Sequence, residues 1–274
     1  MNIFEAIVLG IVEGLTEFLP VSSTGHLTLA EGLLGLPVDD RSITAFTAVI
    51  QIGAIIATLL YFRKDIARLV VGFTRGVASP SHRGQDYRFA WVVIVGSIPI
   101  GVVGFAFQDV ITGPLRNLWV VAAALIVWSG AMVFAERRAT QSRTEDRTTL
   151  RDGLTIGLAQ CVALVPGVSR SGATISAGLL LGLDRVTATR LSFFLAIPAL
   201  TAAGLYELPN ALADGVGLLP TLVGTVVSFV VAYATIAWLL KFVAGNSIVW
   251  FVPYRVALGV VVMVLLAANV LSAT

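Results

Sequence analysis

The sequence predicts an all-α, polytopic integral membrane protein with a single membrane domain over residues 1–274. Hydrophobic residues make up 57% of the 274 residues and charged residues only 12%, about half the charged fraction usual in soluble proteins. The mean hydropathy is +0.91, and several apolar runs approach or exceed the roughly 20 residues that cross a bilayer. The net charge of +2 gives no indication of nucleic-acid binding, because the basic residues are spread over loops.

Six segments are long and apolar enough to be full membrane spans. They are rich in Ala, Val, Leu and Ile, and charged or turn residues flank them. We expect these spans at about 44–62, 89–107, 117–135, 190–206, 218–240 and 251–271. Arg255, near the start of the last span, is expected to extend its long side chain toward the membrane surface.

Two further apolar segments, 1–36 and 153–183, are each interrupted near the middle by Pro and Gly. Polar residues gather at both interruptions. Irregular backbone at membrane depth is tolerated only where it is buried in protein or lines a cavity. Both segments are therefore predicted to be re-entrant helical hairpins, which enter and leave the membrane on the same side.

The two hairpins are expected to be copies of each other. A shift of 147 residues aligns them without a gap: Gly10 with Gly157, Val21 with Val168, Ser22 with Ser169, Gly25 with Gly172, Ala30 with Ala177, and 33–36 with 180–183. Chance matching of Leu and Gly between apolar segments is the alternative. Since each hairpin is followed by three spans, we expect repeat one over 1–135 and repeat two over 153–274.

Basic residues concentrate in alternate connections. Loops 63–88, 136–152 and 184–190 are basic, whereas 207–217 has no Lys or Arg. The positive-inside rule places the basic loops in the cytoplasm, where they could also contact anionic lipid headgroups. Three spans separate the hairpins, so one hairpin enters from each side, which makes an inverted repeat with its site near the midplane. We expect that site to open outward, where the first hairpin enters.

The first interruption carries most of the polar groups. It reads Glu13-Gly14-Leu15-Thr16-Glu17-Phe18-Leu19-Pro20-Val21-Ser22-Ser23-Thr24-Gly25-His26. Glu13 and Glu17 are four residues apart and share one helix face. Adjacent carboxylates in a low dielectric repel each other, and a cation such as Mg²⁺ relieves the repulsion and bridges to phosphate oxygens. The alternative is that the two acids only bond to the broken backbone.

Three hydroxyls and a histidine complete this motif. Ser22, Ser23 and Thr24 follow Pro20, so a hydroxyl there can face a cavity. His26 is three residues after Ser23, close enough to act as its base or to protonate a leaving group. The simpler alternatives are turn bonding by the hydroxyls and an ordinary interior histidine.

The second interruption reads Pro166-Gly167-Val168-Ser169-Arg170-Ser171-Gly172-Ala173-Thr174. Arg170 keeps its charge and presents a fork that suits phosphate; a purely structural pair with a glutamate is the alternative. Hydroxyls flank it, and the Gly172 amide at a helix start could add a backbone donor. Together the two motifs suggest phosphate-ester or diphosphate chemistry in a membrane.

These motifs, over 13–26 and 166–174, resemble those of the bacterial undecaprenyl-diphosphate phosphatase family, also called the bacitracin-resistance protein family. The resemblance extends over essentially the whole chain, with no departure at the charged or hydroxyl positions. It implies hydrolysis of the C55 lipid undecaprenyl diphosphate to undecaprenyl phosphate and inorganic phosphate, which recycles the carrier for peptidoglycan synthesis and confers bacitracin resistance. It also implies a bacterial cytoplasmic (inner) membrane protein, an active site on the periplasmic or outer side, and a divalent metal, Mg²⁺ or Ca²⁺.

The resemblance also implies roles for individual residues. The catalytic set would be Glu13 and Glu17 for metal binding or proton handling, Ser23 as nucleophile, His26 as acid–base partner, and Arg170 as diphosphate clamp. Substrate binding would involve Arg170 with Ser22, Thr24, Ser169, Ser171, Gly172 and Thr174. The attacking group stays open between Ser23, His26 and a water activated by the metal. A transporter or flippase of a lipid phosphate or small anion is the alternative function, and a homodimer is compatible with the sequence.

Overall fold

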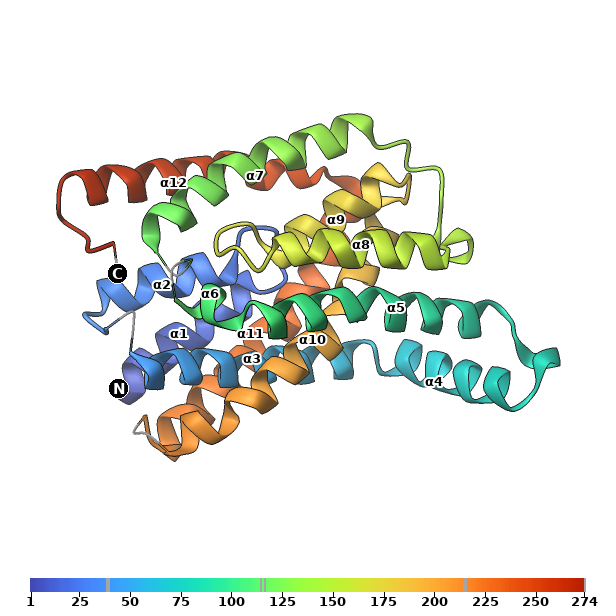
Figure 1. The fold of residues 1–274 in the computed structure, drawn as a ribbon, viewed down its shortest axis with the longest axis horizontal. Helices are drawn as coiled ribbons and strands as arrows, with labels where there is room; N and C mark the ends of the chain where they lie inside the picture. Colours follow the sequence, from blue (N-terminus) through green and yellow to red (C-terminus); the bar gives the residue numbers. More distant parts are fainter. Residues whose placement is uncertain (38–39, 114, 116, 214–215, 274) are drawn as a thin grey trace.

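The computed structural model describes residues 1–37, 40–113, 115, 117–213 and 216–273. All regular elements in these ranges are helices (Figure 1). The α-helices are α1 (Ile3–Thr16), α2 (Ser23–Leu33), α3 (Arg41–Tyr61), α4 (Arg63–Ala78), α5 (Gln85–Ala106), α6 (Gln108–Thr112), α7 (Leu118–Arg138), α8 (Leu150–Val162), α9 (Arg170–Leu180), α10 (Arg185–Ala213), α11 (Leu218–Gly245) and α12 (Val252–Ala267). Short 3₁₀ turns lie at Pro80–His82, Glu145–Arg147 and Ile248–Phe251.

Six helices of the described chain are long and apolar enough to cross a membrane, which confirms the predicted number. They cover Ser42–Tyr61, Gln85–Ala106, Leu118–Arg138, Arg185–Pro209, Leu218–Gly245 and Ile248–Ala267. The fourth begins five residues earlier than predicted, because α10 starts at Arg185 in the connection that was expected to be a basic loop.

Helix α4 was not expected, since the segment 63–88 was predicted to be a loop on account of its charge. Apolar and small residues lie between its basic residues and pack inside the fold. Leu69 is buried, and Gly76 packs directly against Tyr87 of α5. A Cβ atom at position 76 would lie 2.3 Å from the Tyr87 ring. The close approach that glycine permits therefore pairs α4 with the first half of α5.

Helices α1 and α2 form one hairpin and α8 and α9 form another, with the same backbone geometry at their loops. Ser22 and Ser169 have φ angles of 77° and 79°, a region that non-glycine residues rarely adopt. Each hydroxyl accepts a hydrogen bond from the amide of the glycine three residues later, Gly25 at 3.4 Å and Gly172 at 3.1 Å. Each serine thereby caps the second helix of its hairpin.

The match between the hairpins extends to their ends. A capping box begins both α1 and α8, and a left-handed glycine ends both hairpins. These equivalent positions again differ by 147: Asn2 and Thr149, Glu5 and Asp152, Gly35 and Gly182. The aligned residues thus occupy the same structural positions.

The two hairpins start from opposite ends of the molecule and their loops meet between them (Figure 1). The Gly167 amide donates to Ser22 Oγ at 3.2 Å, and Ser171 Oγ donates to the Leu19 carbonyl at 2.9 Å. Residues 145 or more apart in sequence are therefore joined directly.

The three basic connections gather at one end of the molecule, as their charge pattern predicted (Figure 1). Arg68 of α4 contacts Glu145 at 2.6 Å and Asp86 of α5 at 3.1 Å. Arg190 of α10 contacts Asp65 at 2.8 Å and Glu145 at 3.3 Å. These ion pairs link α4, α5, α10 and the connection between α7 and α8.

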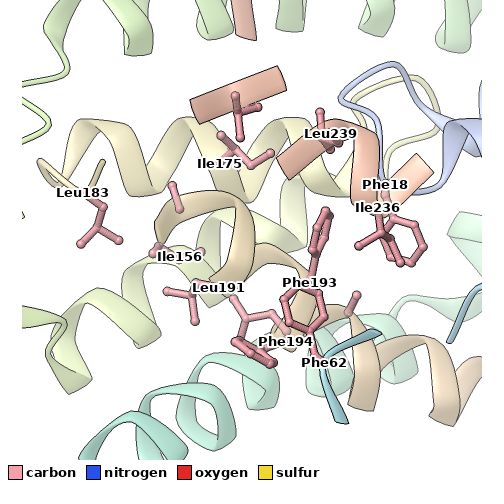
Figure 2. Close-up of a cluster of buried hydrophobic side chains, with 14 of the residues drawn as sticks. Phe18, Phe62, Ile156, Ile175, Leu183, Leu191, Phe193, Phe194, Ile236 and Leu239 are labelled. Atoms are coloured by element: carbon pink, nitrogen blue, oxygen red, sulfur yellow. The ribbon is translucent and has the colours of Figure 1, made fainter. Parts of the chain in front are cut away.

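An aromatic cluster lies beneath the first loop. Figure 2 shows Phe18 beside Phe193, with Phe62 and Phe194 continuing the cluster. The ring centroids of Phe18 and Phe193 are 5.1 Å apart in an edge-on arrangement, and Phe62 lies 5.2 Å from Phe194. Such pairs add about 0.5–1.5 kcal/mol each beyond the burial of area. The cluster fixes the loop that carries the adjacent Glu17.

Candidate active site

A pocket of about 140 Å³ opens at the meeting point of the two hairpin loops. Apolar residues from α5, α10 and the second hairpin form part of its wall. The polar side chains that line it are Glu17, Ser22, Ser23, Thr24, Gln51, Ser169 and Arg170. The pocket therefore brings together polar residues from both sequence motifs.

Ser23 and Glu17 form the shortest polar contact in this pocket. Ser23 is the first residue of α2, and Glu17 is the C-cap residue of α1. The hairpin loop between the two helices brings these side chains together. Ser23 Oγ donates to Glu17 Oε2 at 2.6 Å. Both residues are largely buried, since only 9% of Ser23 and 5% of Glu17 is exposed. A carboxylate that accepts the hydroxyl proton can act as the base that activates a serine.

Arg170 contacts the other oxygen of Glu17. Its Nη2 and Nε atoms donate to Glu17 Oε1 at 3.0 and 3.3 Å, while Nη1 donates to the Ser192 carbonyl at 2.9 Å. The guanidinium also lies 6.0 Å from the centre of the Phe18 ring. These contacts fix the orientation of Arg170 at the pocket, where a positive charge would attract an anion.

Glu13 lies one turn before Glu17 and is fully buried. Within the described ranges, neither of its carboxylate oxygens has a hydrogen-bond partner, and Glu13 does not line the pocket. A buried carboxylate without a partner is costly unless a proton or a cation neutralises it. Glu13, followed one turn later by Glu17, fits the one or two carboxylates with which proteins usually hold a hard cation. No cluster of three or more His, Cys, Asp or Glu residues occurs in the described structure.

His26 does not pair with Ser23, contrary to the prediction. Its Nδ1 atom is 2.7 Å from the Ser22 carbonyl and its Nε2 atom is 2.6 Å from Tyr254 Oη. The His26 and Tyr254 rings stack with centroids 5.5 Å apart. Both ring nitrogens of His26 are thus occupied by Ser22 and by Tyr254 of α12, while Ser23 faces Glu17.

Three predicted substrate-binding residues lie outside the pocket lining. Ser171 and Thr174 are fully buried, and Thr174 Oγ1 donates to Ser192 Oγ at 2.7 Å. The Gly172 amide donates to Ser169 Oγ rather than into the pocket. Gly172 completes the α9 cap, Thr174 joins α9 to α10, and Ser171 joins the two hairpin loops. Sequence spacing cannot distinguish such contacts from ligand contacts.

Ser22, Thr24 and Ser169, which were predicted to bind substrate, line the pocket. Thr24 is exposed, whereas Ser22 and Ser169 are buried and already cap α2 and α9. Gln51 of α3 also reaches the pocket. The sequence indicates Gln51 as a candidate for the pocket, because it is a polar residue in the middle of an apolar span.

Arg255 is fully buried and does not extend to the membrane surface, so the prediction for it was wrong. It donates to the Pro20 carbonyl at 2.9 Å, to the Gly167 and Val168 carbonyls at 2.9 and 3.1 Å, and to Ser129 Oγ at 3.1 Å. One guanidinium thus holds both hairpin loops. Sequence analysis missed this role, since the acceptors are backbone carbonyls far away in the chain. It also missed Tyr254, whose partner His26 is 228 residues away.

Comparison with known proteins gives a consistent result over the whole chain. A family model described as "Bacitracin resistance protein BacA" matches residues 6–261. "Undecaprenyl-diphosphatase 3" of Frankia casuarinae is 59% identical, with 100% of both chains covered. "Undecaprenyl-diphosphatase 1" of Streptomyces avermitilis is 57% identical over 99% of both chains, and "Undecaprenyl-diphosphatase" of Cutibacterium acnes is 52% identical over 100% of both. With these bacterial relatives and six helices able to span a bilayer, the protein is a bacterial membrane protein. The chain belongs to the bacitracin resistance protein BacA family.

Proposed function

We infer that the protein hydrolyses undecaprenyl diphosphate to undecaprenyl phosphate and inorganic phosphate. The printed names of full-length relatives support this reaction. The hydrogen bond from Ser23 to Glu17 beside Arg170 is the observation that carries it, because it joins a nucleophile, a base and an anion-binding group. The released carrier would return to peptidoglycan and cell-wall synthesis, and a larger supply of it would account for bacitracin resistance.

In the first step, Ser23 Oγ attacks the terminal phosphorus and its proton passes to Glu17 Oε2. The new bond joins Oγ to phosphorus, and the bond from phosphorus to the bridging oxygen breaks. Undecaprenyl phosphate leaves with that electron pair. Arg170 would hold the terminal phosphate, since a charged fork stabilises the negative charge of the transition state.

In the second step, water attacks the phosphoserine. The bond between phosphorus and Ser23 Oγ breaks, and Glu17 returns its proton to Oγ while the water loses a proton to the phosphate. Inorganic phosphate leaves and the starting state is restored. The sum is one substrate and one water converted to two phosphates, so no further co-reactant is needed.

The fit of Glu13 to a cation supports a divalent metal, Mg²⁺ or Ca²⁺, as cofactor. Glu13 would hold it, with Glu17 as the nearest second carboxylate. When bound, such a cation neutralises phosphate charge and helps the leaving group depart. The chain's own contribution is to bury Glu13 completely, with no hydrogen-bond partner for its carboxylate among the described residues.

His26 is a second candidate for direct attack on phosphorus. Its Nε2 atom contacts Tyr254 Oη and it does not line the pocket, which favours Ser23. The chemistry separates the two candidates, because a phosphoserine survives acid and a phosphohistidine does not. We assign His26 to proton transfer at the edge of the site, with Tyr254 as its partner.

The two hairpins are proposed to be re-entrant and related as an inverted repeat, with a site near the membrane midplane. Their matched loop geometry and their opposite starting ends support this arrangement (Figure 1). The basic connections would be cytoplasmic by the positive-inside rule. The first hairpin starts from the opposite end, so the active site is proposed to face the periplasmic or outer side.

The alternative function is a transporter or flippase, which opposed broken helices could serve. Such a carrier would need Arg170 but would have no use for a serine bonded to a carboxylate at 2.6 Å. A homodimer is also compatible with the structure, and cross-linking in detergent would test it. Neither proposal is needed for the reaction above.

The direct test is product analysis in detergent with ¹⁸O-labelled water. Purified protein should convert undecaprenyl diphosphate to equal amounts of undecaprenyl phosphate and inorganic phosphate, with one ¹⁸O in each released phosphate. Arg137→Gln, which changes an exposed side chain outside the pocket, serves as a folding control. Absence of phosphate release from well-folded protein supplied with Mg²⁺ or Ca²⁺ would contradict the proposed reaction and favour the carrier.

A further inference from the structure

A second and larger cavity lies far along the chain from the catalytic residues, in the groove between α4 and the start of α5. Its volume is about 750 Å³, within the range of small-molecule and cofactor sites. Lys64, Arg68 and Arg75 contribute cationic side chains to its lining, together with His82, Asp86 and Tyr87. None of these residues takes part in the proposed hydrolysis.

The charges in this groove are unequally neutralised. Arg68 contacts Asp86 at 3.1 Å and Glu145 at 2.6 Å, so the acid in the groove is already paired. Lys64 and Arg75 have no carboxylate within ion-pair distance in the described part of the chain. The groove therefore presents two unneutralised cations, which suits a phosphate group.

The groove is rigid on its α5 side. A Cβ atom at Gly72 would lie 2.5 Å from Asp86 Cβ, and Phe73 stacks on Tyr87 with ring centroids 6.0 Å apart. Trp91 packs edge-on against Phe73 at 5.5 Å. Close glycine contacts and interlocked rings keep α4 and α5 together, so the groove is preformed rather than made by a ligand.

The position of the groove indicates a membrane surface. Helix α4 begins two residues after the span Ser42–Tyr61, and α5 is itself a candidate span. Tyr and Trp are concentrated where membrane meets water, and the ring cluster of α4 and α5 lies beside the groove. One exposed valine of α4, Val71, lines the groove with 45% of the residue exposed, whereas Val70 and Val77 lie on the opposite face of the helix. Cations beside an exposed valine and a cluster of aromatic rings match a lipid with an anionic headgroup and apolar chains better than a free phosphate ion.

We propose that the groove between α4 and α5 binds the headgroup of an anionic phospholipid in the leaflet nearest the basic connections. Lys64 and Arg75 attract the anionic headgroup, and Val71 lies against the acyl chains. Each Lys or Arg near such a surface contributes enough to change affinity about fivefold. The site is separate from the diphosphate pocket and does not depend on the proposed reaction.

The test is native mass spectrometry of the purified full-length protein titrated with phosphatidylglycerol or with phosphatidylcholine of equal chain length. The wild type should bind phosphatidylglycerol more tightly. Lys64→Gln/Arg75→Gln should weaken that binding roughly 25-fold and leave phosphatidylcholine binding unchanged. Lys64→Arg/Arg75→Lys, which keeps both charges, should bind as the wild type does.

The matched control is Arg137→Gln/Arg151→Gln, which removes two exposed charges from the same end of the molecule but outside the groove. It should retain full phosphatidylglycerol binding. An equal loss of binding in this control would show that phosphatidylglycerol binding depends on overall charge and not on the groove, which would overturn the proposal. Unchanged binding in the Lys64/Arg75 variant would overturn it too. Displacement of phosphatidylglycerol by millimolar inorganic phosphate would instead indicate an ion site.

Discussion

Ser23 Oγ lies 2.6 Å from Glu17 Oε2, although the turn of the first hairpin separates the two residues in sequence. The other oxygen of the same carboxylate, Oε1, accepts a hydrogen bond from Arg170 Nη2 at 3.0 Å. Glu17 therefore connects the proposed nucleophile of one hairpin to the proposed anion clamp of the other. This relationship makes the two loops a single functional unit.

Replacing Glu17 tests the base. Glu17→Gln keeps the shape but removes the charge, so Ser23 loses its proton acceptor and Arg170 its counter-ion. We expect turnover to fall by about 10²–10⁴, measured as phosphate release under saturating substrate. Glu5→Gln, which changes a carboxylate in the capping box of α1 away from the pocket, should retain activity. Normal turnover in Glu17→Gln would contradict the role of Glu17.

Replacing Arg170 tests the clamp. Arg170→Ala removes the charge that faces the pocket and should lower kcat/KM by about 10²–10³ or more. Arg170→Lys should recover part of that loss, because it restores the charge without the fork. Steady-state kinetics on a long-chain isoprenyl diphosphate would measure both. If Arg170→Ala turned over at a near-normal rate, another group would have to hold the diphosphate.

Metal removal tests the role of Glu13. A chelator should abolish phosphate release by the wild type, and Mg²⁺ or Ca²⁺ should restore it. Glu13→Gln should raise the metal concentration needed for half-maximal activity by about tenfold or more. Arg137→Gln, at the exposed end of the molecule, should keep the wild-type metal requirement. Hydrolysis that continues in the presence of the chelator would contradict a role for the metal in the reaction.

Replacing Arg255 tests how the loops are held. Arg255→Met would leave three buried carbonyls without their donor, at a cost of about 1–3 kcal/mol each. We expect thermal unfolding in detergent to begin several degrees lower and hydrolysis to be lost, because the same loops carry Glu17 and Arg170. Arg137→Met, at an exposed position, should unfold as the wild type does. An unchanged unfolding temperature in Arg255→Met would show that other contacts hold the loops.

The sequence predicted the elements whose signals are local. Apolar length gave the six spans, and the 147-residue register anticipated the matching serines Ser22 and Ser169. The approach of Arg170 to the glutamates was also foreseeable, since a buried arginine needs an anion. Which glutamate it meets was not, because that depends on how the two hairpins pack.

Other features depend on long-range packing and could not be predicted. The direction of His26 is set by Tyr254, which lies 228 residues away. The burial of Arg255 depends on carbonyls of two distant loops, which no residue type reveals. Helix α4, by contrast, was missed because its charges suggested a loop, although Ile66, Leu69 and Phe73 recur at helical spacing. The hydroxyls of Ser171 and Thr174 were predicted to bind substrate, but Ser171 donates to the first hairpin loop and Thr174 to α10.

The most direct test of the central claim is phosphate release from a long-chain isoprenyl diphosphate in detergent by the wild type, Ser23→Ala and Thr24→Ala, with acid quenching to detect a phosphoenzyme. Thr24→Ala removes a neighbouring hydroxyl that lines the same pocket, so it should raise KM but still form the phosphoserine. We predict that the wild type forms an acid-stable phosphoserine and releases phosphate. Ser23→Ala should neither form the phosphoenzyme nor release phosphate. Normal turnover by Ser23→Ala, or an acid-labile phosphoenzyme in the wild type, would contradict Ser23 as the nucleophile.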